Sequence, residues 1–179
     1  MLRVVVDTSS LVSYLLTQGK LMRRVVENWH AGRFTFLSSP ATREELASVV
    51  ARPAIRRLAA IPLTEFVQGL ERFTENVPTY RDLPGACRDP KDIKFLVCAV
   101  QGHAHYLVSS DRDLLELRRY QGIGIVNPGE FLIALELYDM KGAEMAAHYA
   151  HSTLESIQAN IPLEAGTATR LAEALAMTG

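Results

Sequence analysis

The chain has 179 residues, of which 48% are hydrophobic and 22% are charged, which is typical of one folded domain with some extra length. This composition excludes a largely disordered chain, and the formal net charge of −1 excludes a uniform polycation or polyanion. The charge is uneven, since residues 1–134 contain 17 Lys and Arg against 14 Asp and Glu, whereas residues 135–179 contain 2 against 6. A basic body with an acidic tail favours an anionic partner for the body.

The sequence lacks the patterns of exported or membrane-bound proteins. The apolar run near the amino terminus is short and ends at Asp7, unlike a secretory leader. The longest charge-free stretch, residues 95–110, contains Gln, Gly, His and Ser and is a poor membrane span. Cys87 and Cys98 show neither a metal-binding spacing nor a disulfide framework. We therefore expect a reduced, cytoplasmic protein with no membrane partner.

The first half of the chain predicts strands that alternate with helices. Three consecutive valines at positions 4–6 predict a strand buried on both faces, and the cap-forming residues 7–10 then begin a helix. A helix is expected over residues 20–30, with Leu21, Val25, Val26 and Trp29 on its apolar face. A short strand over 35–37 and a helix over 40–50 follow. Pro53 and Pro62 divide the next helical material, so that a further helix covers residues 63–75.

The second half repeats this alternation. Residues 78–89 are loop-like, and a helix begins near residues 89–92 and ends at Gly102. Strands are expected over 106–108 and 123–126, with a short helix around 114–117 between them and a last helix over 128–137. The alternation predicts an α/β fold with a mainly parallel central sheet.

Residues 139–179 differ from the body and predict a helical C-terminal extension to a domain that covers residues 1–138. They are rich in alanine and predict two helices split around residues 160–162, the second with its apolar residues at Leu171, Ala172, Leu175 and Ala176. Three roles are open for this extension: packing on a basic groove of the same chain, formation of a homodimer, or a helical pair on the outside of the domain.

Acidic residues stand where the predicted sheet would bind a ligand. Asp7 and Asp111 each follow a buried strand, and ligands of parallel sheets gather at the carboxyl ends of the strands. Glu45 and Asp92 lie on helices that begin near that edge. Asp89 and Asp113 are auxiliary candidates.

A cluster of these carboxylates predicts a divalent metal. Converging carboxylates repel each other, so a partly buried cluster is stable only when some members are protonated or a cation binds. An all-oxygen set without Cys or His suits Mg²⁺ or Mn²⁺. Such an ion activates water and stabilises charge on a phosphoryl group, which indicates phosphodiester hydrolysis.

Five sequence blocks, in this order and spacing, resemble PIN-domain proteins. They are VVVDTSSLVS, SSPATREELASVVARP, RDPKDIKFLVCAV, YLVSSDRDLLEL and IGIVNPGEFL, and they cover about residues 2–134. The chain is most similar to the branch of toxin components of toxin–antitoxin systems, related to VapC ribonucleases. The resemblance implies a PIN-like α/β/α sandwich and a metal-dependent nuclease with an acidic site.

The same resemblance implies a role for each acid. Asp7, Glu45, Asp92 and Asp111 are the implied catalytic and metal-binding residues, and Asp89 is a further metal ligand. Glu45 is preferred to Glu44 because the family pattern places an arginine seven positions on, which is Arg52. The implied auxiliary residues are Ser109, in the place of a common Thr, Asp113 near Asp111, and Ser9, where the family often has Asn.

Each of these residues also has an ordinary structural explanation. Asp7 could only cap a helix, and acids such as Asp89 and Asp92 are favoured at helix starts by the macrodipole. The pairs His103/His105 and His148/His151 lack further ligands that would complete a metal site. Basic residues that could contact RNA phosphates, or could be ordinary surface charges, are Lys91, Lys94 and Arg52, with Arg23, Arg24, Arg56 and Arg57 as further candidates.

The leading hypothesis is a divalent-metal-dependent endoribonuclease that cuts structured RNA and leaves 5′-phosphate and 3′-hydroxyl ends. In the toxin setting, a small antitoxin protein would block its site. A phosphatase of the haloacid-dehalogenase type would need a second Asp two residues after the first, where this chain has Ser9. The alternative from another class is a catalytically weak PIN-fold module that binds RNA or protein.

Overall fold

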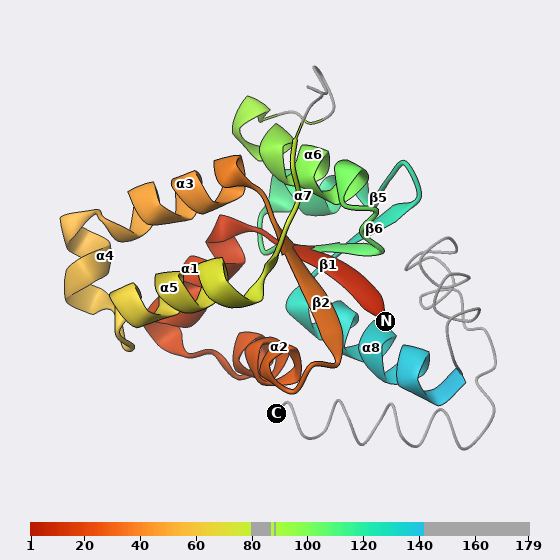
Figure 1. Ribbon diagram of the computed structural model, residues 1–179, viewed down its shortest axis with the longest axis horizontal. Coiled ribbons are helices and arrows are strands. Elements are labelled where there is room, and N and C mark those ends of the chain that lie inside the picture. The colour runs from red at the N-terminus through yellow and green to blue at the C-terminus, as the bar shows by residue number, and fades with distance from the viewer. Residues whose placement is uncertain (80–86, 88, 142–179) are drawn as a thin grey trace.

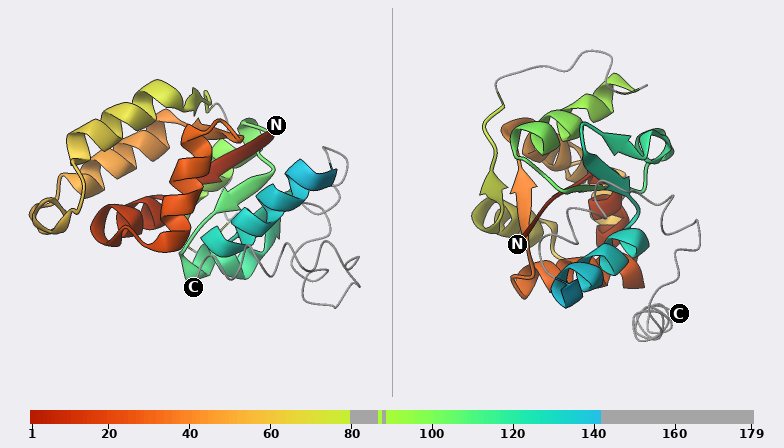
Figure 2. Two further views of the ribbon diagram at one scale, coloured as in Figure 1. Left: turned by 90° about the horizontal axis from the view of Figure 1, so that it is seen from below. Right: turned by 90° about the vertical axis from the view of Figure 1, so that its right-hand side faces the viewer.

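A computed structural model describes residues 1–79, 87 and 89–141 of the chain. A six-stranded sheet lies between two layers of helices (Figures 1 and 2). The strand order is β3-β2-β1-β4-β6-β5, and every pairing is parallel except that of β5 with β6. The expected α/β fold with a mainly parallel central sheet is confirmed.

The four central strands coincide with the four predicted ones. They are β1 (Leu2–Val6), β2 (Phe34–Ser38), β4 (Tyr106–Val108) and β6 (Ile123–Val126). Two edge strands of two residues each, β3 (Glu75–Asn76) and β5 (Arg119–Tyr120), were not predicted. Glu75 was expected at the end of a helix, which was wrong: it pairs with Leu37 of β2.

The helices begin and end close to the predicted positions. They are α1 (Thr8–Thr17), α2 (Lys20–His30), α3 (Pro40–Val50), α4 (Pro53–Leu58), α5 (Leu63–Phe73), α6 (Ile93–Gln101), α7 (Arg112–Leu117) and α8 (Pro128–Lys141). A 3₁₀ turn, Pro90–Asp92, precedes α6. No helix in the described part of the chain has the length and apolarity needed to cross a membrane.

Of the predicted C-terminal extension, only residues 139–141 lie in the described part of the chain. Helix α8 runs across the boundary proposed at residue 138, which stays a prediction. The two helices predicted after it, and the pair His148/His151, lie outside the described residues, as does most of the predicted loop over 78–89.

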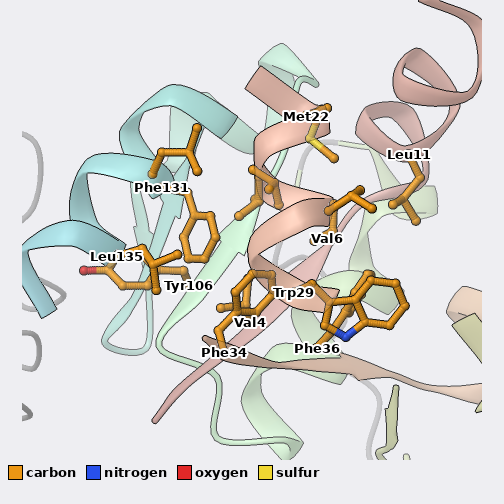
Figure 3. Close-up of a cluster of buried hydrophobic side chains, with 14 of the residues drawn as sticks. Val4, Val6, Leu11, Met22, Trp29, Phe34, Phe36, Tyr106, Phe131 and Leu135 are labelled. Atoms are coloured by element: carbon orange, nitrogen blue, oxygen red, sulfur yellow. The ribbon is translucent and has the colours of Figure 1, made fainter. Parts of the chain in front are cut away.

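The core consists of two layers because strand side chains alternate between the faces of the sheet. On one face, Val4, Phe34 and Tyr106 pack under α1, α2 and α8. Figure 3 shows this cluster, in which the ring of Phe131 lies 5.1 Å from that of Phe34. On the other face, residues such as Leu107 pack under α6 and α7.

The apolar face of α2 differs from the prediction at one position. Met22 is buried together with Val25, Val26 and Trp29, whereas Leu21 is 37% exposed. The helix is therefore rotated slightly relative to the predicted face, because both Leu and Met satisfy the same helical periodicity.

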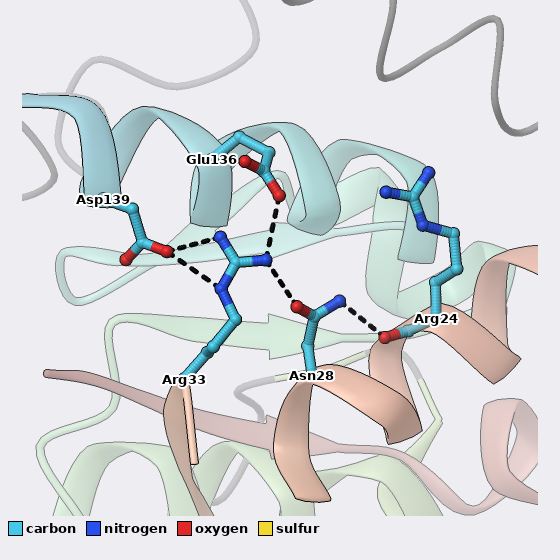
Figure 4. Close-up of polar contacts among 5 residues, drawn as sticks. All are labelled: Arg24, Asn28, Arg33, Glu136 and Asp139. Carbon is cyan, nitrogen blue, oxygen red and sulfur yellow. Dashed lines mark hydrogen bonds and ion pairs between the residues drawn. The ribbon is translucent and has the colours of Figure 1, made fainter. Parts of the chain in front are cut away.

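An ion-pair network fixes α8 to the start of β2 (Figure 4). Arg33 donates from Nε to Asp139 Oδ2 at 2.9 Å and from Nη1 to Glu136 Oε1 at 2.9 Å. The same guanidinium bonds Asn28, whose amide donates to the Arg24 carbonyl at 2.7 Å. These contacts hold α2, β2 and α8 together at a distance from the predicted acidic site.

The order of the strands creates a switch point beside β1. The chain moves from β1 to β2 on one side and returns to β4 on the other, so the carboxyl ends of β1 and β4 are neighbours. Ligands of open α/β sheets bind at such a point. The two strand ends are joined by the bond from Asp7 N to the Val108 carbonyl, at 3.0 Å.

Helices α3, α4 and α5 project from the body as a helical arm, with α4 at the left in Figure 1. Helix α3 packs against α5 within the arm and against α6 of the body. It begins at Ser39, which directly follows β2 and caps α3. The arm therefore starts at the same edge of the sheet as the switch point.

Candidate active site

Asp7 lies at the end of β1 and is held by three donors. Its side chain accepts hydrogen bonds from the Ser10 N–H at 2.8 Å and the Ser9 hydroxyl at 2.7 Å, and also from the Ser109 hydroxyl. Asp7 is only 2% exposed, and this burial raises the pKa of its carboxyl, which the serine hydrogen bonds oppose. The cap role considered for Asp7 is confirmed, since it is the N-cap of α1.

Ser109 connects the two strand ends at the switch point. Its buried hydroxyl donates to Asp7 and accepts the Asp111 N–H at 2.9 Å. Asp111 in turn caps α7 by accepting the Asp113 N–H at 2.8 Å. The side chains after β1 and β4 are therefore fixed relative to each other, as a preformed site requires.

Asp92 shows that the predicted acids share one electrostatic environment. It is half-buried at the start of α6 and makes no cap hydrogen bond of its own. Burial raises its pKa to about 6, and the charges of the other four acids add to this effect. Those four are Asp111, Asp89, Asp7 and Glu45.

Glu45 reaches this region from the helical arm. It is partly buried on α3 and forms an ion pair with Lys94 of α6, whereas its neighbour Glu44 is exposed. Of the two glutamates, Glu45 is the one whose side chain lies between the arm and α6. The ion pair with Lys94 was not predicted, and no local sequence signal could indicate a contact across 49 positions.

The donor chemistry fits a hard divalent cation, although the side chains do not form a ready-made cage. In the described residues, no three Asp, Glu, His or Cys side chains are grouped closely enough to hold a metal ion. Carboxylates without a cation repel each other, and Lys94 engages Glu45. Asp7 uses three of the roughly four acceptor positions of a carboxylate, which leaves one for a cation or water.

The other candidate ligands and cations lie apart from the acids or in different roles. His105 accepts the Arg3 N–H at 2.9 Å through Nδ1, and His103 is exposed beyond the end of α6. Lys91 is exposed, and its N–H donates to Asp89 at 2.9 Å. Arg52 is exposed at the junction of α3 and α4.

Two cavities in the described part of the chain lie away from the predicted acids. One of about 450 Å³ is largely aromatic, lies beside the first residues of β2 at the opposite end of the sheet from Asp7, and includes Trp29, Phe34 and Phe73. Another, of about 390 Å³, lies between α7 and the start of α8 and contains Glu116 and Glu130 among its lining residues. Neither cavity is lined by Asp92 or by any of the four acids that raise its pKa.

Comparison with known proteins supports the reading of the fold. The sequence model of the PIN domain matches residues 3–113, more than half of the chain and a segment that contains all five acids. No curated protein sequence matches the chain. PIN domains are in general metal-dependent nucleases, so the fold is of a nuclease type. The chain therefore belongs to the PIN domain family.

Proposed function

We propose that this protein is a Mg²⁺- or Mn²⁺-dependent endoribonuclease and that it acts as the toxin of a toxin–antitoxin pair. The proposal is carried by one observation: the charges that raise the pKa of Asp92 come from the other four predicted acids. A carboxylate that is surrounded by other negative charges retains its proton or binds a cation. In this proposal the residues that hold the ion are Asp7, Glu45, Asp92 and Asp111, with Asp89 as a further ligand.

The bound ion would supply a more acidic water and neutralise charge on the phosphoryl group. The residues of the chain position that chemistry. The serine hydrogen bonds keep Asp7 fixed and ionisable despite its burial, and Ser109 sets the distance between the ends of β1 and β4. Without a bound ion the pKa of Asp92 is about 6, so a proton competes with the cation for this carboxylate at and below that pH.

Lys94 gives the arm a defined position before a cation binds. Its ammonium group forms an ion pair with Glu45, the only one of the five acids that lies on the arm. If Glu45 helped to hold an ion, Lys94 would lose this partner and its ammonium group could bind a phosphate instead. In the proposal, Lys94 therefore occupies Glu45 in the absence of a cation.

Cleavage of a structured RNA with Mn²⁺, Mg²⁺ or EDTA tests the proposal. Glu45→Gln is expected to reduce cleavage to the EDTA background, whereas Glu44→Gln, its exposed neighbour on α3, keeps wild-type cleavage. Equal activity of the two variants would refute the assigned site. RNA binding without cleavage in any metal would favour the alternative, a catalytically weak binding module.

The toxin role has its own test. Expression of the wild-type chain is expected to arrest growth, and Asp7→Asn is expected to relieve the arrest. Growth arrest by both forms would separate the toxicity from the nuclease. A small antitoxin protein that binds the chain would then be sought by its ability to block RNA cleavage. The homodimer and the cytoplasmic location stay predictions.

A further inference from the structure

The tip of the helical arm has three exposed arginines. Arg52 caps α4, and Arg56 and Arg57 lie in its last turn. All three are exposed, and their side chains make no ion pair or hydrogen bond with any described residue. Residues 46–64 contain no Asp or Glu, so the sequence around them does not neutralise this charge.

These arginines do not serve the fold. Helix α4 buries none of its residues, and its Leu58 is 67% exposed. A surface arginine that packs on nothing and pairs with nothing loses side-chain entropy only when a ligand binds it. The cluster is therefore available to an anionic partner, and its guanidinium groups match phosphate in geometry.

The helix geometry connects Arg52 to the acidic site. Arg52 follows Glu45 by seven positions and comes two residues after the end of α3 at Val50, where the chain turns into α4. The bonds from Ala51 N to the Ala47 carbonyl and from Arg52 N to the Val49 carbonyl, both 3.1 Å, keep the helical course up to Arg52. Glu45 contacts α6 through Lys94, and Arg52 lies further along the same arm.

Arg56 continues this line by one turn. Its N–H donates to the Arg52 carbonyl at 3.0 Å, which places both side chains on one face of α4. The result is a row of three arginines at the turn from α3 into α4, which lies at the far end of the arm in Figure 1. A polymer with several negative charges can contact this row and the acids at once, which a compact anion cannot.

We propose that this row, the arginine track, binds the backbone phosphates of the RNA strand on one side of the cleaved bond. The inference rests on the proposed nuclease, because the acids define where the strand must pass. The track gives affinity and register without reading bases, since phosphate contacts position a nucleic acid but do not specify its sequence. An RNA that reaches only the acids gains nothing from the track.

Fluorescence polarisation with a labelled single-stranded RNA, in EDTA, tests the track apart from catalysis. The triple variant Arg52→Gln, Arg56→Gln, Arg57→Gln is expected to weaken binding of a 12-nucleotide RNA. Its plot of log affinity against log salt should be shallower by about 2, because each lost phosphate contact removes roughly 0.7 from the slope. The triple variant should bind a trinucleotide as tightly as the wild type does, because so short an RNA does not reach from the acids to the track.

Two matched controls accompany the triple variant. Arg72→Gln removes an exposed arginine from α5 of the same arm, where it stacks on Phe73, and should leave RNA binding unchanged. Leu58→Gln removes the exposed apolar side chain of α4 and should also leave it unchanged. If Leu58→Gln weakens RNA binding as much as the triple variant does, an electrostatic phosphate track is refuted.

The outcomes separate the track from the nuclease. Unchanged affinity and salt slope in the triple variant overturn the track, even if RNA is cut. If the triple variant instead loses only the binding of an acidic peptide, the cluster is a protein-docking surface and the track is equally overturned. Weaker RNA binding by the triple variant, in a protein that cuts no RNA with any metal, refutes the proposed nuclease but supports the track.

Discussion

Asp92→Asn is expected to make the metal-free protein more stable. The pKa of Asp92 is about 6 in the folded chain against 3.8 for an ordinary Asp, so ionising it in the native state costs up to about 3 kcal/mol at pH 7.5. Solvent screening of this half-exposed group reduces the cost to about 1–2 kcal/mol. Asn also loses a favourable charge at the start of α6, worth about 0.3–1 kcal/mol, which leaves a net gain of about 1 kcal/mol.

The pH dependence gives this prediction its sign. Because the folded pKa is raised, the native state holds the proton more tightly, and wild-type stability falls as the pH rises from about 4 to about 6. At pH 4 the cost of ionising Asp92 should therefore contribute little to the difference in stability between the two proteins. The difference in favour of Asp92→Asn should grow up to about pH 7. A shift of about 2–4 °C in Tm corresponds to 1 kcal/mol for a chain of this size.

Thermal unfolding in EDTA from pH 4 to pH 8 measures this difference, with Glu44→Gln as the control for loss of an exposed acid. Saturating Mn²⁺ should reverse the order, because only the wild type retains the full ligand set. A variant that is less stable than the wild type at pH 7.5 in EDTA, or a difference that does not change with pH, would refute the reasoning.

Three further predictions follow from the same contacts. Ser109→Ala removes a buried hydrogen bond to a carboxylate and should lower the free energy of unfolding in urea by about 2 kcal/mol, whereas Ser109→Thr, which keeps the hydroxyl, should lower it much less. Lys94 competes with a cation for Glu45, so Lys94→Met should strengthen Mn²⁺ binding, measured by calorimetry, by up to about fivefold. Weaker binding would show that Lys94 supports the ligand set. Phe131→Ala should lower the free energy of unfolding, followed by tryptophan fluorescence, by about 3–5 kcal/mol, because its ring is buried against Phe34. Leu58→Ala should lower it by less than about 0.5 kcal/mol. Similar losses in the two variants would show that Phe131 does not anchor the core.

The fold was predictable where local physics determines it. Proline and glycine mark the ends of the helices, as Pro40 and Gly102 show, and runs of buried β-branched residues mark the central strands. The strands β3 and β5 were missed because two residues are too few for any periodicity, and each exists only through its neighbour in the sheet. Thr74, which ends α5, offers no sequence signal as strong as proline.

The sequence nominated the acids of the proposed site, which stay a prediction, but it did not indicate the side chains that contact them. Strand ends and block spacing located Asp7 and Asp111, and the resemblance selected Glu45 and Asp92. The contact of Lys94 with Glu45 and the bridge made by Ser109 depend on segments far apart in the chain, so no local pattern could reveal them. The prediction of Lys94 as a phosphate contact did not foresee this ion pair.

The central claim is that the acids around Asp92 share one divalent ion, and anomalous diffraction from a crystal soaked in Mn²⁺ tests it most directly. The account predicts a manganese peak coordinated by carboxylate oxygens of Asp7, Asp92 and Asp111, and no such peak in Asp92→Asn soaked in the same way. A peak at another place, or none between these side chains in a crystal that takes up manganese elsewhere, would contradict it.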